Sequence, residues 1–283
     1  MGFGIEKLGE STDGAAFKVE ADRAKAYAAA TNDPIPADRS GEVAPPVFAI
    51  VPVWDTMIGA MAGVVPPEVV AMVVHGEQDM FFHAPIRPGM VLRTTAAPVG
   101  VHVKPNGTSV IAKTATYDQD DTLLVEQYMT SFFRGVSDGE SAGEEAPPHK
   151  LDLAVTEREP DAVVDQQMDA DQTFRYAEAS GDTMPMHLDE EFAKSVGLPG
   201  IIIHGLCTMA FASWAVVTAV GGNDPARLKR LAVRFSRPVL PGQQITTRIW
   251  KTGTNDGNTV FGFQTTNPDG DLFIKDGLAE IAP

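Results

Sequence analysis

The sequence predicts an α+β protein built of two tandem units, each a curved antiparallel sheet that wraps one long apolar helix. Two observations carry this prediction. The same short motifs occur in both halves of the chain, and in each half one long apolar segment precedes a series of strand-like segments. A helix that is apolar on nearly all sides must be buried on most of them. A sheet curved around it achieves this burial in a chain with few other helices.

The repeat consists of three short matches that occur in the same order in both halves. Residues 27–36 read YAAATNDPIP, and residues 176–185, which begin 149 positions later, read YAEASGDTMP. The other two matches pair FHAPIRPG at 82–89 with FSRPVLPG at 235–242, and GTSVIAKT at 107–114 with GNTVFGFQ at 257–264. These nearly constant offsets predict an internal duplication. The alternative is recurrent turn chemistry, because Pro-Gly pairs precede many strands.

The segment 136–150 predicts the boundary between the two halves. It reads VSDGESAGEEAPPHK, with four acidic residues and paired prolines. Such a composition is typical of a linker. We therefore expect domains at 1–135 and 151–283, joined by the linker at 136–150.

Each half places the same elements in the same order. A short amphipathic helix is expected first, at 22–30 and again at 171–179, and a loop rich in Gly, Pro and Asp follows it. The long apolar helix comes next, at 47–61 and again at 204–220. Alternating and β-branched segments then predict strands. These strands are expected at 91–95, 109–117 and 123–133, and at 231–235, 245–250, 259–265 and 271–281. One such unit has the architecture called a hotdog, and two make a double hotdog.

Charge and composition exclude several classes of protein. Asp and Glu number 38 against 22 Lys and Arg, and a net charge of -16 repels a phosphate backbone, so no nucleic-acid partner is expected. The single cysteine, Cys207, cannot form an internal disulfide, which favours a reducing compartment. No signal peptide precedes Gly9, and the longest apolar stretch, 205–220, is too short to span a bilayer comfortably. We expect a soluble cytoplasmic protein with no membrane partner.

The candidate catalytic residues lie in the segment 179–206, which reads ASGDTMPMHLDEEFAKSVGLPGIIIHGL. It resembles the hydratase 2 motif of the MaoC-like enoyl-CoA hydratases and dehydratases, which is SGDxNPxH followed by a short helix with an alanine and a terminal HG. The matching positions are Ser180, Gly181, Asp182, Pro185, His187, Ala193, His204 and Gly205. The resemblance continues through Arg234, Phe235, Pro238, Pro241 and Gly242 and covers most of 165–283. It implies a double hotdog with a degenerate N-terminal half, catalytic Asp182 and His187, and the Gly205 N–H as oxyanion donor.

The same residues suit the hydration of an α,β-unsaturated thioester. Asp182 and His187 lie five positions apart on a loop that Pro185 keeps from becoming helical. A carboxylate and an imidazole that share one water can deprotonate that water and protonate the α-carbon. A main-chain N–H at the start of a buried helix, here that of Gly205, can stabilise negative charge on the thioester oxygen. Taken singly, Asp182 could be a turn residue and His187 a surface histidine, and for His204 we favour a packing role.

Two departures from the motif bear on activity. Met184 stands where the family usually has Asn, whose hydrogen bonds would hold the loop. Either the loop is held in another way or the site is altered. In the first half Asp33 matches Asp182, but Asp38 stands at the position of His187 and cannot replace an imidazole near neutral pH. We therefore expect one active site per chain.

The apolar segment of the first half is expected to form a broken or shortened helix. It contains Pro52, Gly59 and Gly63, and a proline inside a helix costs about 3 kcal/mol or more. The resemblance implies that the acyl tail of the substrate lies in the hollow that a shorter helix leaves. The alternative is a helix that simply begins after Pro52.

A local basic cluster occurs in this acidic chain. Its members are Arg227, Lys229, Arg230, Arg234 and Arg237. Arginine suits the 3′-phosphate and the diphosphate of coenzyme A. The residues that we expect to bind CoA are Arg234, Arg237, Arg230 and Lys229, and the alternative is a solvated strand edge. The six histidines show no close ligand spacing and no phosphate-binding glycine motif occurs, so we expect no metal and no cofactor besides the CoA of the substrate.

The residues and the resemblance together predict an (R)-specific enoyl-CoA hydratase. This hydro-lyase of fatty-acid metabolism converts trans-2-enoyl-CoA into (R)-3-hydroxyacyl-CoA, or runs the reverse dehydration. Three alternatives stay open: a 3-hydroxyacyl-ACP dehydratase of a fatty-acid or polyketide pathway, a thioesterase, and a catalytically silent acyl-CoA-binding hotdog protein. The acyl chain, the pathway and the oligomeric state, a homodimer among the options, are also open at this point.

Overall fold

The computed structural model describes residues 2–283, which form two compact units that do not follow the order of the chain. Unit 1 comprises the residues up to Lys18 with Pro52–Ala84 and Met90–Pro148, and unit 2 comprises Val19–Val51, Pro85–Gly89 and His149–Pro283. Residues 19–51 therefore belong to the same unit as the C-terminal half, although they precede the expected linker. Most of that linker belongs to unit 1, where β7 (Ala142–Gly143) pairs with a longer strand.

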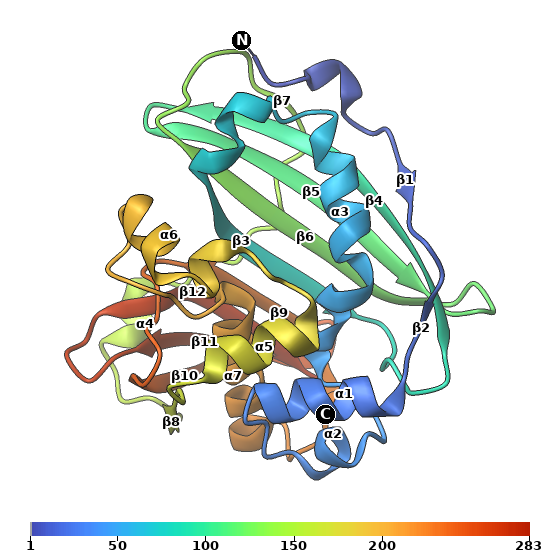
Figure 1. The fold of residues 1–283 in the computed structure, drawn as a ribbon. Coiled ribbons are helices and arrows are strands. Elements are labelled where there is room, and N and C mark those ends of the chain that lie inside the picture. Colours follow the sequence, from blue (N-terminus) through green and yellow to red (C-terminus); the bar gives the residue numbers. More distant parts are fainter. Residues whose placement is uncertain (1) are drawn as a thin grey trace. The chain divides into compact units, whose positions relative to one another are not determined.

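Unit 1 is an antiparallel sheet with one α-helix on its inner face. Its other strands are β1 (Thr12–Asp13), β2 (Phe17–Lys18), β3 (Val73–Phe82), β4 (Val91–Lys104), β5 (Gly107–Tyr117) and β6 (Leu123–Arg134). Their order is β1-β4-β5-β6-β3, and β2 also pairs with β4. Helix α3 (Trp54–Ala62) runs along β4 and β5 (Figure 1). In the sequence, the 3-10 helix η1 (Ile5–Lys7) precedes β1, and η3 (Pro67–Met72) directly precedes β3.

Unit 2 repeats this plan with a longer helix. Its strands are β8 (Ala162–Gln167), β9 (Leu228–Phe235), β10 (Gln244–Asn255), β11 (Asn258–Thr266) and β12 (Leu272–Ile281). They are antiparallel in the order β9-β12-β11-β10-β8. Helix α7 (Gly205–Val220) contacts β8, β9, β10 and β12, and most of its residues are buried. The other helices are α1 (Ala21–Ala30), α2 (Pro36–Ser40), α4 (Leu153–Thr156), α5 (Gln172–Ser180), η4 (Pro185–His187), α6 (Glu190–Ser195) and η5 (Pro225–Arg227).

The long apolar segment of the first half forms a shorter α-helix than α7, as predicted. Residues 46–53 form the 3-10 helix η2 (Pro46–Val53), and α3 begins only at Trp54. Pro52 has no N–H to donate and its ring opposes an α-helical turn before it. Helix α3 therefore has 9 residues, whereas α7 has 16. It simply begins after Pro52, which is the alternative given in the sequence analysis. The sequence did not indicate β3 and β8, whose residues alternate less clearly, nor the two-residue strands β1, β2 and β7.

The internal repeat is visible as contacts between matching residues in unit 2. Helices α1 and α5 pack together, and the hydroxyls of Tyr27 and Tyr176, which are 149 positions apart, lie 3.1 Å from each other. Asn32 and Gly181 also match, and both have a left-handed backbone, with φ of 49° and 88°. Each of them directly precedes the aspartate of its half. The residue before the aspartate is thus left-handed in both copies of the motif.

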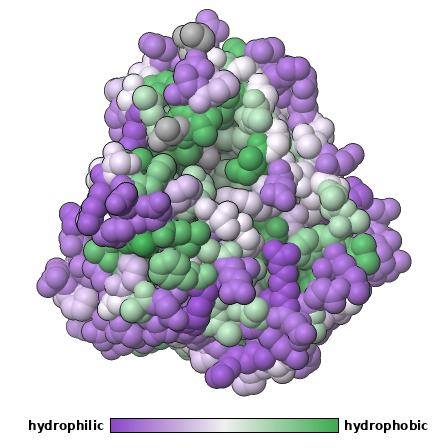
Figure 2. All heavy atoms as spheres, in the orientation of Figure 1, coloured by the Kyte–Doolittle hydropathy of each residue, from purple (hydrophilic) through white to green (hydrophobic). Residues whose placement is uncertain are grey.

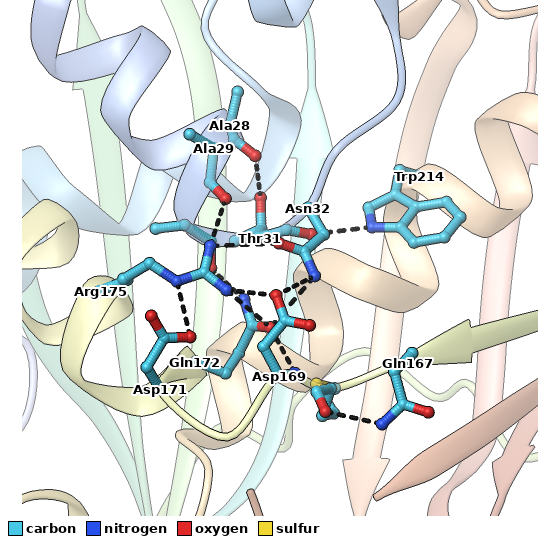
Figure 3. Close-up of polar contacts among 12 residues, drawn as sticks. Ala28, Ala29, Thr31, Asn32, Gln167, Asp169, Asp171, Gln172, Arg175 and Trp214 are labelled. Atoms are coloured by element: carbon cyan, nitrogen blue, oxygen red, sulfur yellow. Dashed lines mark hydrogen bonds and ion pairs between the residues drawn. The ribbon is translucent and has the colours of Figure 1, made fainter. Parts of the chain in front are cut away.

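Side chains of the C-terminal half cap the end of α1 (Figure 3). The last carbonyls of a helix have no partner inside it. Arg175 donates to the Ala29 carbonyl, Gln172 to the Ala30 carbonyl, and the Trp214 indole N–H to the Thr31 carbonyl at 3.1 Å. These bonds attach a helix of the first half to α5 and α7, and they explain why residues 19–51 belong to unit 2.

Hydrophilic residues cover most of the face shown in Figure 2, with smaller apolar areas between them. None of the helices formed by residues 2–283 is both long enough and apolar enough to cross a bilayer.

Candidate active site

One loop of unit 2 brings Asp182 and His187 into the interior. Helix α5 ends at Ser180, and Gly181 turns the chain in the left-handed region, where glycine is unstrained. The Ser180 hydroxyl then accepts from the Asp182 N–H, and the Asp182 carboxylate accepts from the Met184 N–H, each at 3.1 Å. The loop ends in η4, which carries His187. Both Asp182 and His187 are buried, at 9% and 8% exposure.

The hydrogen bonds of His187 leave one ring nitrogen for chemistry. Nδ1 lies 2.8 Å from the carbonyl oxygen of Ile202, and a carbonyl only accepts, so Nδ1 carries the proton. In the neutral ring Nε2 then has its lone pair available. The Thr173 hydroxyl on α5 lies 3.0 Å from the main-chain carbonyl of His187 and 3.1 Å from Nδ1 of His204, so helix α5 packs against the end of this loop. His187 is therefore held in a defined tautomer as well as a defined place.

A third residue, His204, completes a compact cluster. One ligand-type atom each of Asp182, His187 and His204 lies within 4.8 Å of the other two. The imidazole rings of His187 and His204 are stacked, with centroids 3.8 Å apart and planes at 23°. Sequence spacing did not indicate this cluster, because His204 is 17 positions beyond His187 and approaches only when α7 packs into the sheet.

The cluster fits a metal ion poorly. A histidine binds zinc through a lone pair in the ring plane, at about 2.0–2.1 Å. Both nitrogens of His204 are already hydrogen-bonded, to the Asp182 carbonyl and to the Thr173 hydroxyl. In two stacked imidazole rings the nitrogen lone pairs point in nearly parallel directions. An ion bound to both rings would therefore lie far out of the plane of at least one of them.

Burial shifts the pKa values of the pair in opposite directions. Burial raises the pKa of the Asp182 carboxyl, against the opposing effects of His187 and the Met184 N–H. Burial lowers the pKa of His187, against the opposing effects of the Ile202 carbonyl and Asp182. Each shift favours the uncharged form. The result is a carboxyl that retains a proton more readily and an imidazole that is free to accept one.

Gly205 begins α7, the central helix of unit 2. The first N–H groups of a helix have no partner inside it, and they point along the positive end of the helix dipole. A Cβ built on Gly205 would lie 3.3 Å from the ring of Phe235, so a side chain here would press on that ring. The position therefore favours glycine and presents its N–H as an electrostatic donor.

The comparisons with known proteins agree with this geometry. Residues 39–135 match the family model of the MFE-2 hydratase 2 N-terminal domain, and residues 153–269 match that of the MaoC like domain. A protein of Dictyostelium discoideum named probable enoyl-CoA hydratase 2 is 33% identical over 213 residues, which are 75% of this chain and 71% of that protein. The chain belongs to the MaoC-like hydratase 2 family. It spans only 28% and 30% of two longer relatives, the peroxisomal multifunctional enzymes type 2 of mouse and fruit fly.

Solved structures confirm the fold expected of this family. A MaoC-like dehydratase from Phytophthora capsici superposes with a TM-score of 0.84 at 26% identity, covering 99% of this chain and 97% of that one. A Mycobacterium tuberculosis protein described as a double hotdog superposes with a TM-score of 0.61 at 14% identity, covering 99% and 97%. The fold is a double hotdog.

The usual Asn of the hydratase 2 motif is replaced by Met184, and the loop is held without it. The main-chain N–H of Met184 donates to the Asp182 carboxylate, and the Met184 side chain is 39% exposed. Main-chain bonds do not depend on the side chain at that position. The structure thus shows a loop held in another way, the first of the two outcomes that we considered.

The matching positions of the first half cannot form the same site. Asp38, which replaces His187, is fully buried, and burial together with the nearby Asp33 raises its pKa to about 9. The imidazole is therefore missing from this copy.

The basic cluster is divided between half-buried and exposed members. Arg227 donates to the carbonyls of Gly221 and Ala282, and Lys229 donates to the carbonyl of Ala226. Arg230 lies 3.7 Å from the Glu280 carboxylate, and both side chains are largely buried. Arg234 and Arg237 are exposed, and Arg237 forms an ion pair with Asp271. Binding of CoA by these residues stays a prediction for Arg234, Arg237, Arg230 and Lys229. Arg234 and Arg237 are the better candidates of the four because they are exposed.

Proposed function

We propose that this chain adds water across the double bond of trans-2-enoyl-CoA to form (R)-3-hydroxyacyl-CoA, and catalyses the reverse dehydration. The observation that carries the proposal is the buried Asp182–His187 pair on the hydratase 2 loop. Membership of the family and the relative named probable enoyl-CoA hydratase 2 support the same reaction.

The mechanism uses the two opposite pKa shifts. A water molecule is held between the pair, and Nε2 of His187 removes one of its protons as the oxygen bonds to C3. The Asp182 carboxyl donates its proton to C2. The Gly205 N–H stabilises the negative charge that develops on the thioester oxygen. Proton transfer from the His187 imidazolium to the Asp182 carboxylate then restores both groups.

Coenzyme A is proposed as the carrier of the acyl group, bound through its phosphates by Arg234 and Arg237. No cofactor beyond this CoA takes part in the proposal. The pathway proposed is fatty-acid metabolism. The compartment proposed is the cytoplasm, although some relatives are named peroxisomal enzymes.

The deciding experiment is a survey of trans-2-enoyl thioesters with chiral analysis of the product. We expect hydration of enoyl-CoA substrates to the (R)-3-hydroxyacyl product. The same acyl groups on acyl carrier protein test the dehydratase alternative, and release of free thiol tests the thioesterase. Tight acyl-CoA binding without turnover would contradict the proposal and favour a silent binding protein.

A further inference from the structure

His204 is the residue of the cluster to which the proposed mechanism gives no task. It directly precedes α7 and is 1% exposed. Its ring contacts two other rings, that of His187 at 3.8 Å and that of Tyr176 at 4.9 Å between centroids. The Tyr176 hydroxyl in turn meets that of Tyr27 on α1. His204 is thus held by residues of the C-terminal half, and one of them, Tyr176, is bonded in turn to Tyr27.

The two nitrogens of His204 are both used. Nε2 lies 3.0 Å from the main-chain carbonyl of Asp182, so Nε2 carries a proton and donates it. Nδ1 lies 3.1 Å from the Thr173 hydroxyl. Through these contacts His204 holds the main chain of Asp182, while its ring face limits where His187 can move. No other side chain contacts both members of the pair in this way among the interactions seen within residues 2–283.

His204 stays uncharged at neutral pH. Burial, and then the adjacent His187, lower its pKa to about 3, while the bond to the Asp182 carbonyl opposes this. An uncharged ring stacks on His187 without repelling the proton that His187 acquires during turnover. The protonation state of His204 therefore does not change in the working range of the mechanism.

We propose that His204 is a positioning residue that sets the separation and orientation of Asp182 and His187 and exchanges no proton itself. This inference rests on the proposed function for its kinetic consequences. It goes beyond the packing role that the sequence suggested, because it assigns separate tasks to the ring face and to Nε2.

Three substitutions separate these tasks. His204→Gln retains an N–H at the distance of Nε2, His204→Asn retains a polar group at the distance of Nδ1, and His204→Ala retains neither. Because a misplacement of about 1 Å can cost about 100-fold in rate, we expect His204→Ala and His204→Asn to lower kcat about 100-fold and His204→Gln about 10-fold, with KM within about threefold. His149→Gln is the matched control. His149 is also buried in unit 2 and its Nδ1 lies 2.7 Å from the Asp276 carbonyl, and we expect its kcat to be unchanged.

A second measurement follows the titration of His187 by NMR and the acid limb of kcat/KM. Loss of the ring in His204→Ala admits water to His187, so its pKa rises and the acid limb moves to higher pH. In His204→Gln the limb keeps its position. If a variant only contained less folded protein, its rate would fall, but the acid limb of kcat/KM would stay at the same pH as in the parent.

Several results would overturn the proposal. Equal losses of kcat in the Gln, Asn and Ala variants would exclude the Nε2 bond as the cause. Disappearance of the acid limb in His204→Gln would make His204 an acid–base group. Loss of activity on chelation, restored by Zn²⁺, would make it a metal ligand. A parent without hydratase activity would contradict the proposed function, while the NMR titration of His187 in parent and variants would still decide whether His204 positions it.

Discussion

At the scale of single residues, burial determines the chemistry of Asp182 and His187. In water the carboxyl would be ionised, and the imidazole would hold a proton over part of the physiological pH range. Inside unit 2 burial shifts both groups toward their uncharged forms. A carboxyl that retains its proton more readily and an imidazole with a free lone pair are the acid and the base that the proposed hydration of an enoyl thioester uses.

The first prediction concerns this pair. Asp182→Asn and His187→Gln each remove an acid–base group, so we expect kcat to fall at least about 100-fold with little change in the unfolding midpoint. Steady-state kinetics and thermal unfolding of the purified variants measure both effects. Asp33→Asn, at the matching position of the first half, is the control and should keep its turnover. Comparable loss in Asp33→Asn would mean that the first half is not degenerate.

The second prediction concerns Asp38 and stability. In the folded chain its pKa is about 9, raised by burial and by Asp33, whereas in the unfolded chain it is about 4. The stability that this group contributes is therefore complete below about pH 4 and is lost as pH rises toward 9. The Asp38→Asn variant has no carboxyl at this position and does not lose stability in this way. The unfolding free energy of the variant minus that of the parent should therefore increase with pH, by at most about 1.4 kcal/mol per pH unit. Denaturant titrations at about pH 5, 7 and 8.5 measure the difference, and a constant difference would contradict the assignment.

At the scale of elements, α1 is joined to the C-terminal half by hydrogen bonds at both of its ends. The carbonyls at its C-terminus accept from Gln172, Arg175 and Trp214 (Figure 3). Near its N-terminus, Arg23 lies within 3.5 Å of the carbonyls of Ala179 and Ser180, directly before the catalytic loop. A helix of the first half therefore stabilises the loop that carries Asp182.

The third prediction tests this attachment. Trp214→Phe keeps an aromatic ring but removes the N–H that donates to the Thr31 carbonyl, at a cost of about 1 kcal/mol of unfolding free energy. We expect faster hydrogen exchange in α1, measured amide by amide. Trp250→Phe is the matched control, since the Trp250 N–H donates to the Arg158 carbonyl at 3.0 Å in the same unit. That control should lose similar stability without faster exchange in α1, and equal exchange in both variants would exclude the proposed attachment.

At the scale of the whole molecule, an acidic chain has to bind an anionic carrier. The net charge of -16 repels the phosphates of CoA, so a local basic site is needed to offset it. Of the cluster in and around β9, Arg234 and Arg237 are the exposed members. Surface pairs with phosphate weaken as salt rises, with a screening length of about 8 Å at physiological ionic strength.

The fourth prediction follows from this charge balance. Arg234→Gln and Arg237→Gln should raise KM for enoyl-CoA several-fold and leave kcat almost unchanged, because the nucleotide is remote from the reacting carbons. A pantetheine thioester without the nucleotide is the control substrate and should show no such loss. The KM of the parent should also increase with salt more than that of the variants. Equal losses on both substrates would identify the cluster as a solvated strand edge.

The sequence by itself determined the elements and the chemistry that residues close in the chain create. The repeat, the apolar helices and most strands follow from local periodicity, and Pro52 alone accounts for the late start of α3. Asp182 and His187 could be paired from the sequence because five positions on one loop separate them. Backbone sterics and side-chain pattern act over short stretches of chain, so these features need no knowledge of the fold.

Only the tertiary structure decided which distant groups meet. It placed residues 19–51 with the C-terminal half, because the open carbonyls of α1 find their donors on α5 and α7. It brought His204 onto His187, and it divided the arginines into half-buried and exposed groups. These outcomes depend on hydrogen bonds and ring contacts between residues 17 to 183 positions apart, which a local pattern does not encode. The pKa shifts arise for the same reason, since burial is a property of the packed molecule.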